Sequence, residues 1–233
     1  MKPFYTFVTL ALIVCFPCVL SAQGRASLLE QRIQFAVEDA SLANTQLTKP
    51  DAYGTPLIFK LARKGDVRAL AQAVQRATSG EFLTMQDTYG NNLFHVAKDA
   101  PTILAIASGI RQFYGTKAPQ QIATLVNQRN HISQTPLIAQ VSAGHSDTFE
   151  LLYPYSQLSQ KSKFAKARLS RLQGSDETLV AQNRAIYCRE IRQLASANGK
   201  TLLQIAQEQV SYRPYMAPVA QKIRERVYCL ADD

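Results

Sequence analysis

Three histidines and four cysteines are the side chains in this chain best suited to nucleophilic or metal chemistry, and they are scattered along the sequence. A nucleophile needs a base within reach, and a metal site needs ligands at close spacing. Cys188 and Cys229 have no histidine near them, and the glycines do not follow a phosphate-binding loop pattern. We therefore predict that the protein is not an enzyme, acts on no small-molecule substrate and needs no cofactor or metal. The histidines are His95, His131 and His145.

The first 22 residues have the layout of a secretory signal peptide. Lys2 precedes an apolar run from about residue 4 to residue 20, and small residues follow. We expect cleavage after Ala22, which removes Cys15 and Cys18 together with their Cys-x-x-Cys spacing. One alternative is an uncleaved membrane anchor, because about 18 apolar residues nearly suffice to span a bilayer. Another is a lipoprotein site at Cys15. The protein is thus predicted to be periplasmic or secreted.

Basic charge is concentrated in the C-terminal third of the chain. The whole chain has a formal net charge of +9, and residues 151–233 contain 13 basic and 7 acidic side chains. This excess suits an anionic partner, such as lipid headgroups, a cell-wall polymer or an acidic protein face. It equally suits a solvated helix surface. Nucleic acid is not expected as a partner, because no aromatic or glycine-rich recognition motif accompanies the charge.

Residues 126–152 place a turn, a Thr-Pro-Leu helix start, a Gly-His break and a Leu-Leu helix in a fixed order. This order resembles the ankyrin repeat, which is identified by its period and its T-P-L-H-x-A core. Three further windows, starting at Asp51, Asp87 and Asn198, resemble the same template with local departures. The window at Asp87 has Asn92-Leu93 in place of Thr-Pro, and the window at Asn198 lacks the proline.

The spacing of these windows predicts the organisation of the chain. The equivalent turn positions Gly54, Gly90, Ser133 and Gly199 are separated by 36, 43 and 66 residues, whereas the family period is about 33. The longer intervals must hold extra structure, which we expect to be a short helix over residues 118–127 and then a helical pair. The resemblance implies an all-α solenoid of about four helical pairs, and we expect no strands. The expected segments are a signal peptide (1–22), an N-terminal capping helix (23–50), three ankyrin-like repeats (51–153), an inserted basic helical pair (154–195), and a fourth repeat with a C-terminal cap (196–233).

Helical periodicity predicts the caps and the apolar sides of these elements. The spacing of Ser27 and Glu30 predicts a capping box at the start of the N-terminal helix. In the inserted pair, we expect Gly174 to end the first helix and Ser175 to cap the second. The residues expected on the apolar sides of the inserted pair are Leu158, Ala165, Leu169 and Leu172, followed by Leu179, Ile186, Ile191 and Leu194. Those expected in the second helix of the second repeat are Ile103, Leu104, Ala107, Ile110 and Phe113.

The resemblance also implies roles for the histidines and the turn tips. His95 and His145 occupy template positions where ankyrin proteins use histidine for hydrogen bonds within and between turns. Aromatic side chains at equivalent tips are suited to interfaces. The alternatives are that each tyrosine packs against the neighbouring turn and that His131 is simply exposed. The candidate partner-binding residues are Tyr53, Tyr89, His131 and Ile132.

These observations favour binding by shape. We predict an exported bacterial ankyrin-repeat protein that mediates protein–protein interaction through its turn tips and concave face. The alternative is an envelope- or membrane-associated protein whose basic C-terminal helices bind an anionic surface. Because second helices of successive units lie side by side in such a stack, we predict a disulfide between Cys188 and Cys229, the latter near the end of the final helix. Two buried free thiols are the other possibility.

Overall fold

The computed structural model describes residues 44–230 except residues 78, 173 and 175. The predicted signal peptide, its cleavage site and the capping box at Ser27 therefore lie outside the described residues.

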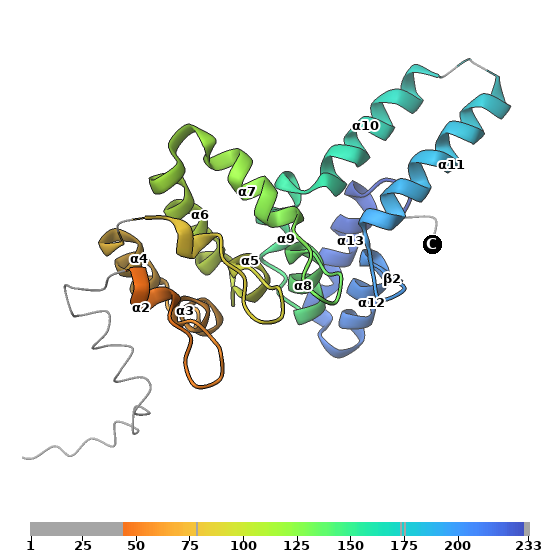
Figure 1. Ribbon diagram of the computed structural model, residues 1–233. Coiled ribbons are helices and arrows are strands. Elements are labelled where there is room, and N and C mark those ends of the chain that lie inside the picture. The colour runs from red at the N-terminus through yellow and green to blue at the C-terminus, as the bar shows by residue number, and fades with distance from the viewer. Residues whose placement is uncertain (1–43, 78, 173, 175, 231–233) are drawn as a thin grey trace, which may run out of the picture.

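The described part is mostly helical, which confirms the all-α prediction (Figure 1). The helices are α2 (Asn44–Thr48), α3 (Leu57–Lys64), α4 (Val67–Arg76), α5 (Leu93–Val96), α6 (Ala100–Tyr114), α7 (Ala118–Asn127), α8 (Pro136–Ala143), α9 (Phe149–Leu152), α10 (Gln157–Arg171), α11 (Glu177–Leu194), α12 (Leu202–Tyr212) and α13 (Ala217–Arg226). Short 3₁₀ turns are η1 (Glu81–Leu83), η2 (Gly115–Lys117), η3 (Tyr153–Tyr155) and η4 (Pro214–Met216).

The helices of the body contact one another in two series. Helices α3, α5, α8 and α12 touch in that order, and α4, α6 and α9 touch in a second series. These short helices cannot bury their apolar side chains alone, so neighbours in each series complete the core. Phenylalanines from successive elements lie fully inside this core: Phe59, Phe82, Phe94 and Phe149. The additional helix expected over residues 118–127 is α7.

A small hairpin departs from the expectation of no strands. Strands β1 (Ser196–Ala197) and β2 (Lys200–Thr201) pair antiparallel across a two-residue turn. Asn198 and Gly199 in that turn have φ values of 52° and 75°. Tight hairpin turns require this left-handed backbone, which asparagine and glycine tolerate best. The hairpin leads directly into α12, where the Thr201 side chain accepts a hydrogen bond from the Gln204 N–H.

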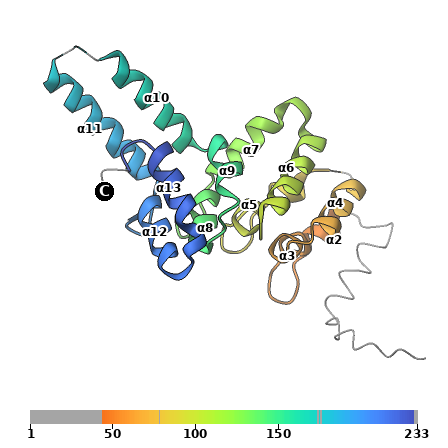
Figure 2. The ribbon, with the colours of Figure 1, turned by 180° about the vertical axis from the view of Figure 1, so that it is seen from behind.

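Helices α10 and α11 form a pair that projects from the body (Figures 1 and 2). Leu158, Ala165 and Ile191 are buried where the pair joins the body. Leu179 and Ile186, expected on the apolar side of α11, are 45% and 47% exposed, because the outer turns of α11 extend beyond the body.

Two further details of the sequence-based expectations are corrected. Leu104, expected among the apolar positions of the helix that is now α6, is 50% exposed. The residue that caps α11 in the described structure is Asp176, whose side chain accepts a hydrogen bond from the Thr178 N–H. The predicted cap, Ser175, lies outside the described residues. An acidic side chain suits this position, because the amide groups at a helix start carry partial positive charge.

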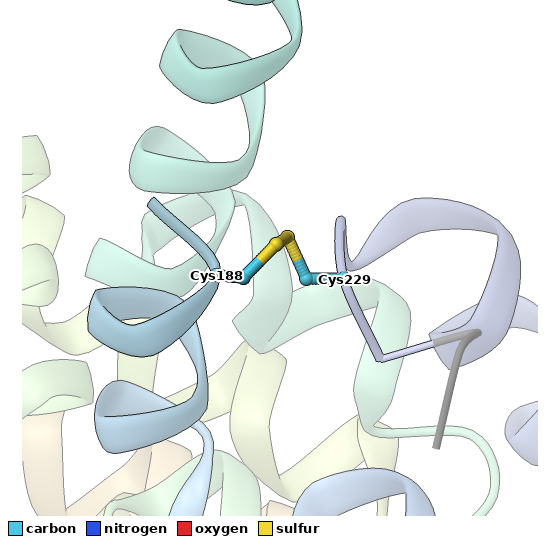
Figure 3. Close-up of a disulfide and its surroundings, with 2 residues drawn as sticks. All are labelled: Cys188 and Cys229. Carbon is cyan, nitrogen blue, oxygen red and sulfur yellow. A yellow bond between two sulfur atoms is a disulfide. The ribbon is translucent and has the colours of Figure 1, made fainter. Parts of the chain in front are cut away.

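The predicted disulfide joins Cys188 in α11 to Cys229, with their Cα atoms 5.3 Å apart (Figure 3). Both cysteines are buried. The position of Cys229 differs from the expectation, because α13 ends at Arg226 and Cys229 follows it with a φ of 69°. The bond therefore anchors the segment after α13, and not the helix itself, to the base of α11.

Candidate interaction surface

Three turns, which precede α3, α5 and α8, share one hydrogen-bonding scheme. Each begins with Asp or Asn, whose side-chain oxygen accepts from the backbone N–H groups two and four residues later. These bonds are short: 2.9 and 2.9 Å at Asp51, 2.9 and 2.9 Å at Asp87, and 3.2 and 2.9 Å at Asn130. The fourth residue is left-handed in every case, with φ values of 74°, 73° and 60°. The left-handed residues are Gly54, Gly90 and Ser133.

The third residue of each turn presents a large side chain to solvent. Tyr53, Tyr89 and Ile132 are 89%, 67% and 56% exposed. His131, which precedes Ile132, is exposed as well. The hydrogen bonds of the turn use only the backbone of the third residue, so its side chain is not needed to form the turn. We call Tyr53, Tyr89, His131 and Ile132 the turn-tip row.

The second and third turns are joined directly, which fixes the spacing of their tips. The His131 N–H donates to the Tyr89 carbonyl at 3.0 Å. The Asn130 amide donates to Asn91 Oδ1 at 2.8 Å. Gly90 permits this close approach, because a Cβ atom built there would lie 2.7 Å from the His131 ring. Arg63 of α3 pairs with the carboxylate of Asp87, which begins the second turn, at 2.7 Å.

His95 connects the second unit to the third turn. The Asn92 N–H donates to His95 Nδ1 at 3.1 Å, and Nε2 lies 3.0 Å from the Gln134 carbonyl. The neutral ring satisfies both contacts, because Nδ1 accepts while Nε2–H donates. Burial lowers the pKa of His95 to about 4, so the ring is neutral at pH 7. These are contacts within and between turns, as the resemblance implied.

His145 has a partner that the sequence analysis did not identify. Its Nδ1 lies 2.6 Å from Oε1 of Gln140, a buried residue of α8. The Gln140 Nε2 donates to the carbonyls of Phe94 and Ala97, both at 2.9 Å. Burial lowers the pKa of His145 as well. A glutamine within the apolar run of α8 was the available signal, because buried amides are normally hydrogen-bonded.

The C-terminal basic residues lie on different elements from the turn-tip row. Lys161 of α10 pairs with Glu190 of α11 at 2.9 Å. Glu150 accepts from both Lys222 and Arg226 of α13, and these hydrogen bonds and charges lower its pKa. The basic surface is therefore partly neutralised near α13, whereas α10 carries five basic and no acidic side chains.

The described residues thus combine a helical body, a row of exposed turn tips and a projecting basic helical pair. Among these residues, no group of three metal-ligating side chains comes together. No described helix has both the length and the apolar character needed to cross a bilayer. Comparison with models of known protein families and with curated proteins finds no match.

Proposed function

We propose that this chain is an exported ankyrin-like repeat protein that binds a partner protein through its turn-tip row and the adjoining concave face. The observation that carries this proposal is the repetition of Tyr53, Tyr89 and Ile132 at the third position of turns with the same hydrogen bonds. Solvent exposure of one apolar side chain is ordinary, but a regular row of them is typical of a binding surface.

The contacts among the helices support the ankyrin-like arrangement. In a repeat stack, first helices contact first helices and second helices contact second helices. The series α3–α5–α8–α12 and α4–α6–α9 follow this pattern. The left-handed glycines that end α3 and α8, Gly65 and Gly144, lie at equivalent points of their units. The interval between turns nevertheless varies, because α7 and the α10–α11 pair are added to the two-helix repeat.

The connections between adjacent turns support a binding role for the tips. A surface whose side chains are held at fixed spacing loses less conformational entropy when it binds. The backbone bond from His131 to Tyr89 and the side-chain bond from Asn130 to Asn91 hold the second and third tips together. Tyrosine also offers a large apolar ring with a hydroxyl group, which suits the mixed character of protein interfaces.

The test is a pull-down from native envelope extract with the chain that begins at Gln23, followed by titration calorimetry with the captured protein. The double variant Tyr53→Ala/Tyr89→Ala should weaken binding by about 2 kcal/mol or more with little change in thermal stability. Tyr212→Ala is the matched control, because Tyr212 is 82% exposed on α12 and lies outside the turn-tip row. Equal affinity for the wild-type chain and the double variant would refute the proposal.

A further inference from the structure

Three large apolar side chains on the projecting helical pair remain half exposed. Phe164 of α10 is 51% exposed, and Leu179 and Ile186 of α11 are 45% and 47% exposed. The pair extends away from the turns that precede α3, α5 and α8 (Figures 1 and 2). These side chains therefore form a second surface, which is separate from the turn-tip row.

Helical spacing places these residues on one stripe of each helix. In α10, residues 161, 164, 168 and 171 recur at intervals of three and four, so they form one stripe. In α11, Leu179 and Ile186 are seven residues apart and share a stripe with Glu190.

Contacts between the helices bring the two stripes together near the base of the pair. Lys161 pairs with Glu190 at 2.9 Å, and the Phe164 ring meets the Tyr187 ring edge-on at 5.9 Å. We call the combined surface the hairpin face. Its members are Lys161, Phe164, Arg168, Arg171, Leu179, Ile186 and Glu190, and Glu190 is paired with Lys161.

The hairpin face combines apolar side chains with a local excess of positive charge. The Arg168 guanidinium lies 5.9 Å from the centre of the Phe164 ring. From Gln157 to Leu194, the pair contains eight basic and three acidic side chains, and two of the acids, Asp176 and Glu177, are at the start of α11. The charge on α10 is therefore unopposed within its own helix.

We propose that the hairpin face docks on an anionic lipid bilayer. Phe164, Leu179 and Ile186 enter the headgroup region, while Arg168 and Arg171 contact lipid phosphates and Lys161 offsets the charge of Glu190. Helices that bind at the surface of membranes combine these two features, because apolar insertion and attraction to anionic lipid add to each other. An acidic protein surface would match the charges, but it would leave the three apolar side chains against polar groups.

Vesicle co-sedimentation tests this proposal with the chain that begins at Gln23, because apolar residues 4–20 would themselves bind lipid. The chain should bind vesicles of phosphatidylglycerol and phosphatidylcholine, and it should bind vesicles of phosphatidylcholine alone at least about tenfold more weakly. Added salt should weaken the binding, because it screens the phosphates.

Two variants separate the contributions of the apolar and basic side chains. Phe164→Ser/Leu179→Ser/Ile186→Ser and Lys161→Gln/Arg168→Gln/Arg171→Gln should each reduce binding about tenfold or more. The control for charge is Lys49→Gln/Arg111→Gln/Lys117→Gln, which removes the same charge from exposed residues elsewhere and should reduce binding much less. Circular dichroism establishes that the variants remain folded.

A fluorescent reporter gives a readout that does not depend on disruptive variants. The chain contains no tryptophan, so Phe164→Trp introduces a single probe on the hairpin face. Its emission should shift to shorter wavelength with anionic vesicles and remain unchanged with neutral vesicles. Three outcomes would each overturn the proposal. The emission could remain unshifted with anionic vesicles, or the charge control could lose as much binding as the hairpin-face variant. The chain could also bind polyglutamate without binding vesicles. Tyr53→Ala/Tyr89→Ala should bind vesicles normally, so this test is independent of the turn-tip proposal.

Discussion

At the scale of single residues, a few polar side chains join one helical unit to the next. His95 connects the start of α5 to the third turn, and Gln140 connects α8 to the end of α5. Both side chains are buried, so water does not compete for their hydrogen bonds. A buried polar group that loses its partners is more costly than the mean energy of a hydrogen bond suggests. These two residues are therefore expected to influence stability strongly.

The low pKa of His95 predicts that the protein loses stability in mild acid. The folded-state pKa is about 4, compared with an ordinary value of 6.5. Between these pH values the unfolded chain binds the proton more readily than the folded chain. The contribution of neutral His95 to folding stability is therefore complete above about pH 6.5 and is lost as pH falls toward 4. Urea unfolding at pH 7 and pH 4 should differ by up to about 3 kcal/mol from this group. His95→Gln should flatten the profile, and an unchanged profile would contradict this explanation.

Replacement of Gln140 by leucine should destabilise the protein by about 2 to 3 kcal/mol. The leucine fits an apolar interior, but the carbonyls of Phe94 and Ala97 would lose their donor. Urea unfolding measures the effect. Gln207→Leu in α12 is the matched control, because Gln207 is exposed and its change should alter stability by no more than about 0.5 kcal/mol. Similar effects of the two substitutions would show that the Gln140 hydrogen bonds contribute little.

At the scale of elements, the sequence indicated helix positions well because they depend on local signals. Thr-Pro-Leu starts α8 and Gly144 ends it, and both act through backbone geometry within a few residues. The exposure of Leu179 and Ile186 was not predictable in this way. Helical spacing identifies an apolar stripe, but it does not show whether another element covers that stripe. The role of Gln140 likewise depends on carbonyls more than 40 residues away in sequence.

Reduction of the disulfide between Cys188 and Cys229 should lower stability by about 4 kcal/mol in the chain-entropy model, because the bond closes a long loop. The two residues are 41 positions apart. Guanidinium unfolding with and without reductant measures the change. The variant Cys188→Ser/Cys229→Ser should have the stability of the reduced wild-type chain under both conditions, so reductant should not change it. Alkylation of two free thiols in the protein isolated from its native host would contradict the bond.

At the scale of the whole molecule, two surfaces with different chemistry lie on different parts of the chain. The turn-tip row presents aromatic and aliphatic side chains at successive turns, whereas the hairpin face presents apolar side chains among cations. If both proposals hold, the protein can contact a membrane while its turn tips remain available to a partner. Salt separates the two activities, because it screens binding to lipid phosphates far more than it weakens burial of tyrosine rings.

Export should yield a protein that begins near Gln23 or Arg25. The basis is the apolar run followed by small residues up to Ala22, which is typical of a cleaved signal peptide. N-terminal sequencing of the protein from its native host provides the measurement. A chain that still begins at Met1 would favour the uncleaved membrane anchor.

The covalent link between Cys188 and Cys229 also determines how the molecule carries mechanical load. The segment between the two cysteines includes β1, β2, α12 and α13. A pulling force applied to the C-terminal end passes through the sulfur atoms directly into α11 and does not extend this segment. In the oxidised protein, tension at that end is therefore delivered to the projecting helical pair, and β1, β2, α12 and α13 are shielded from it.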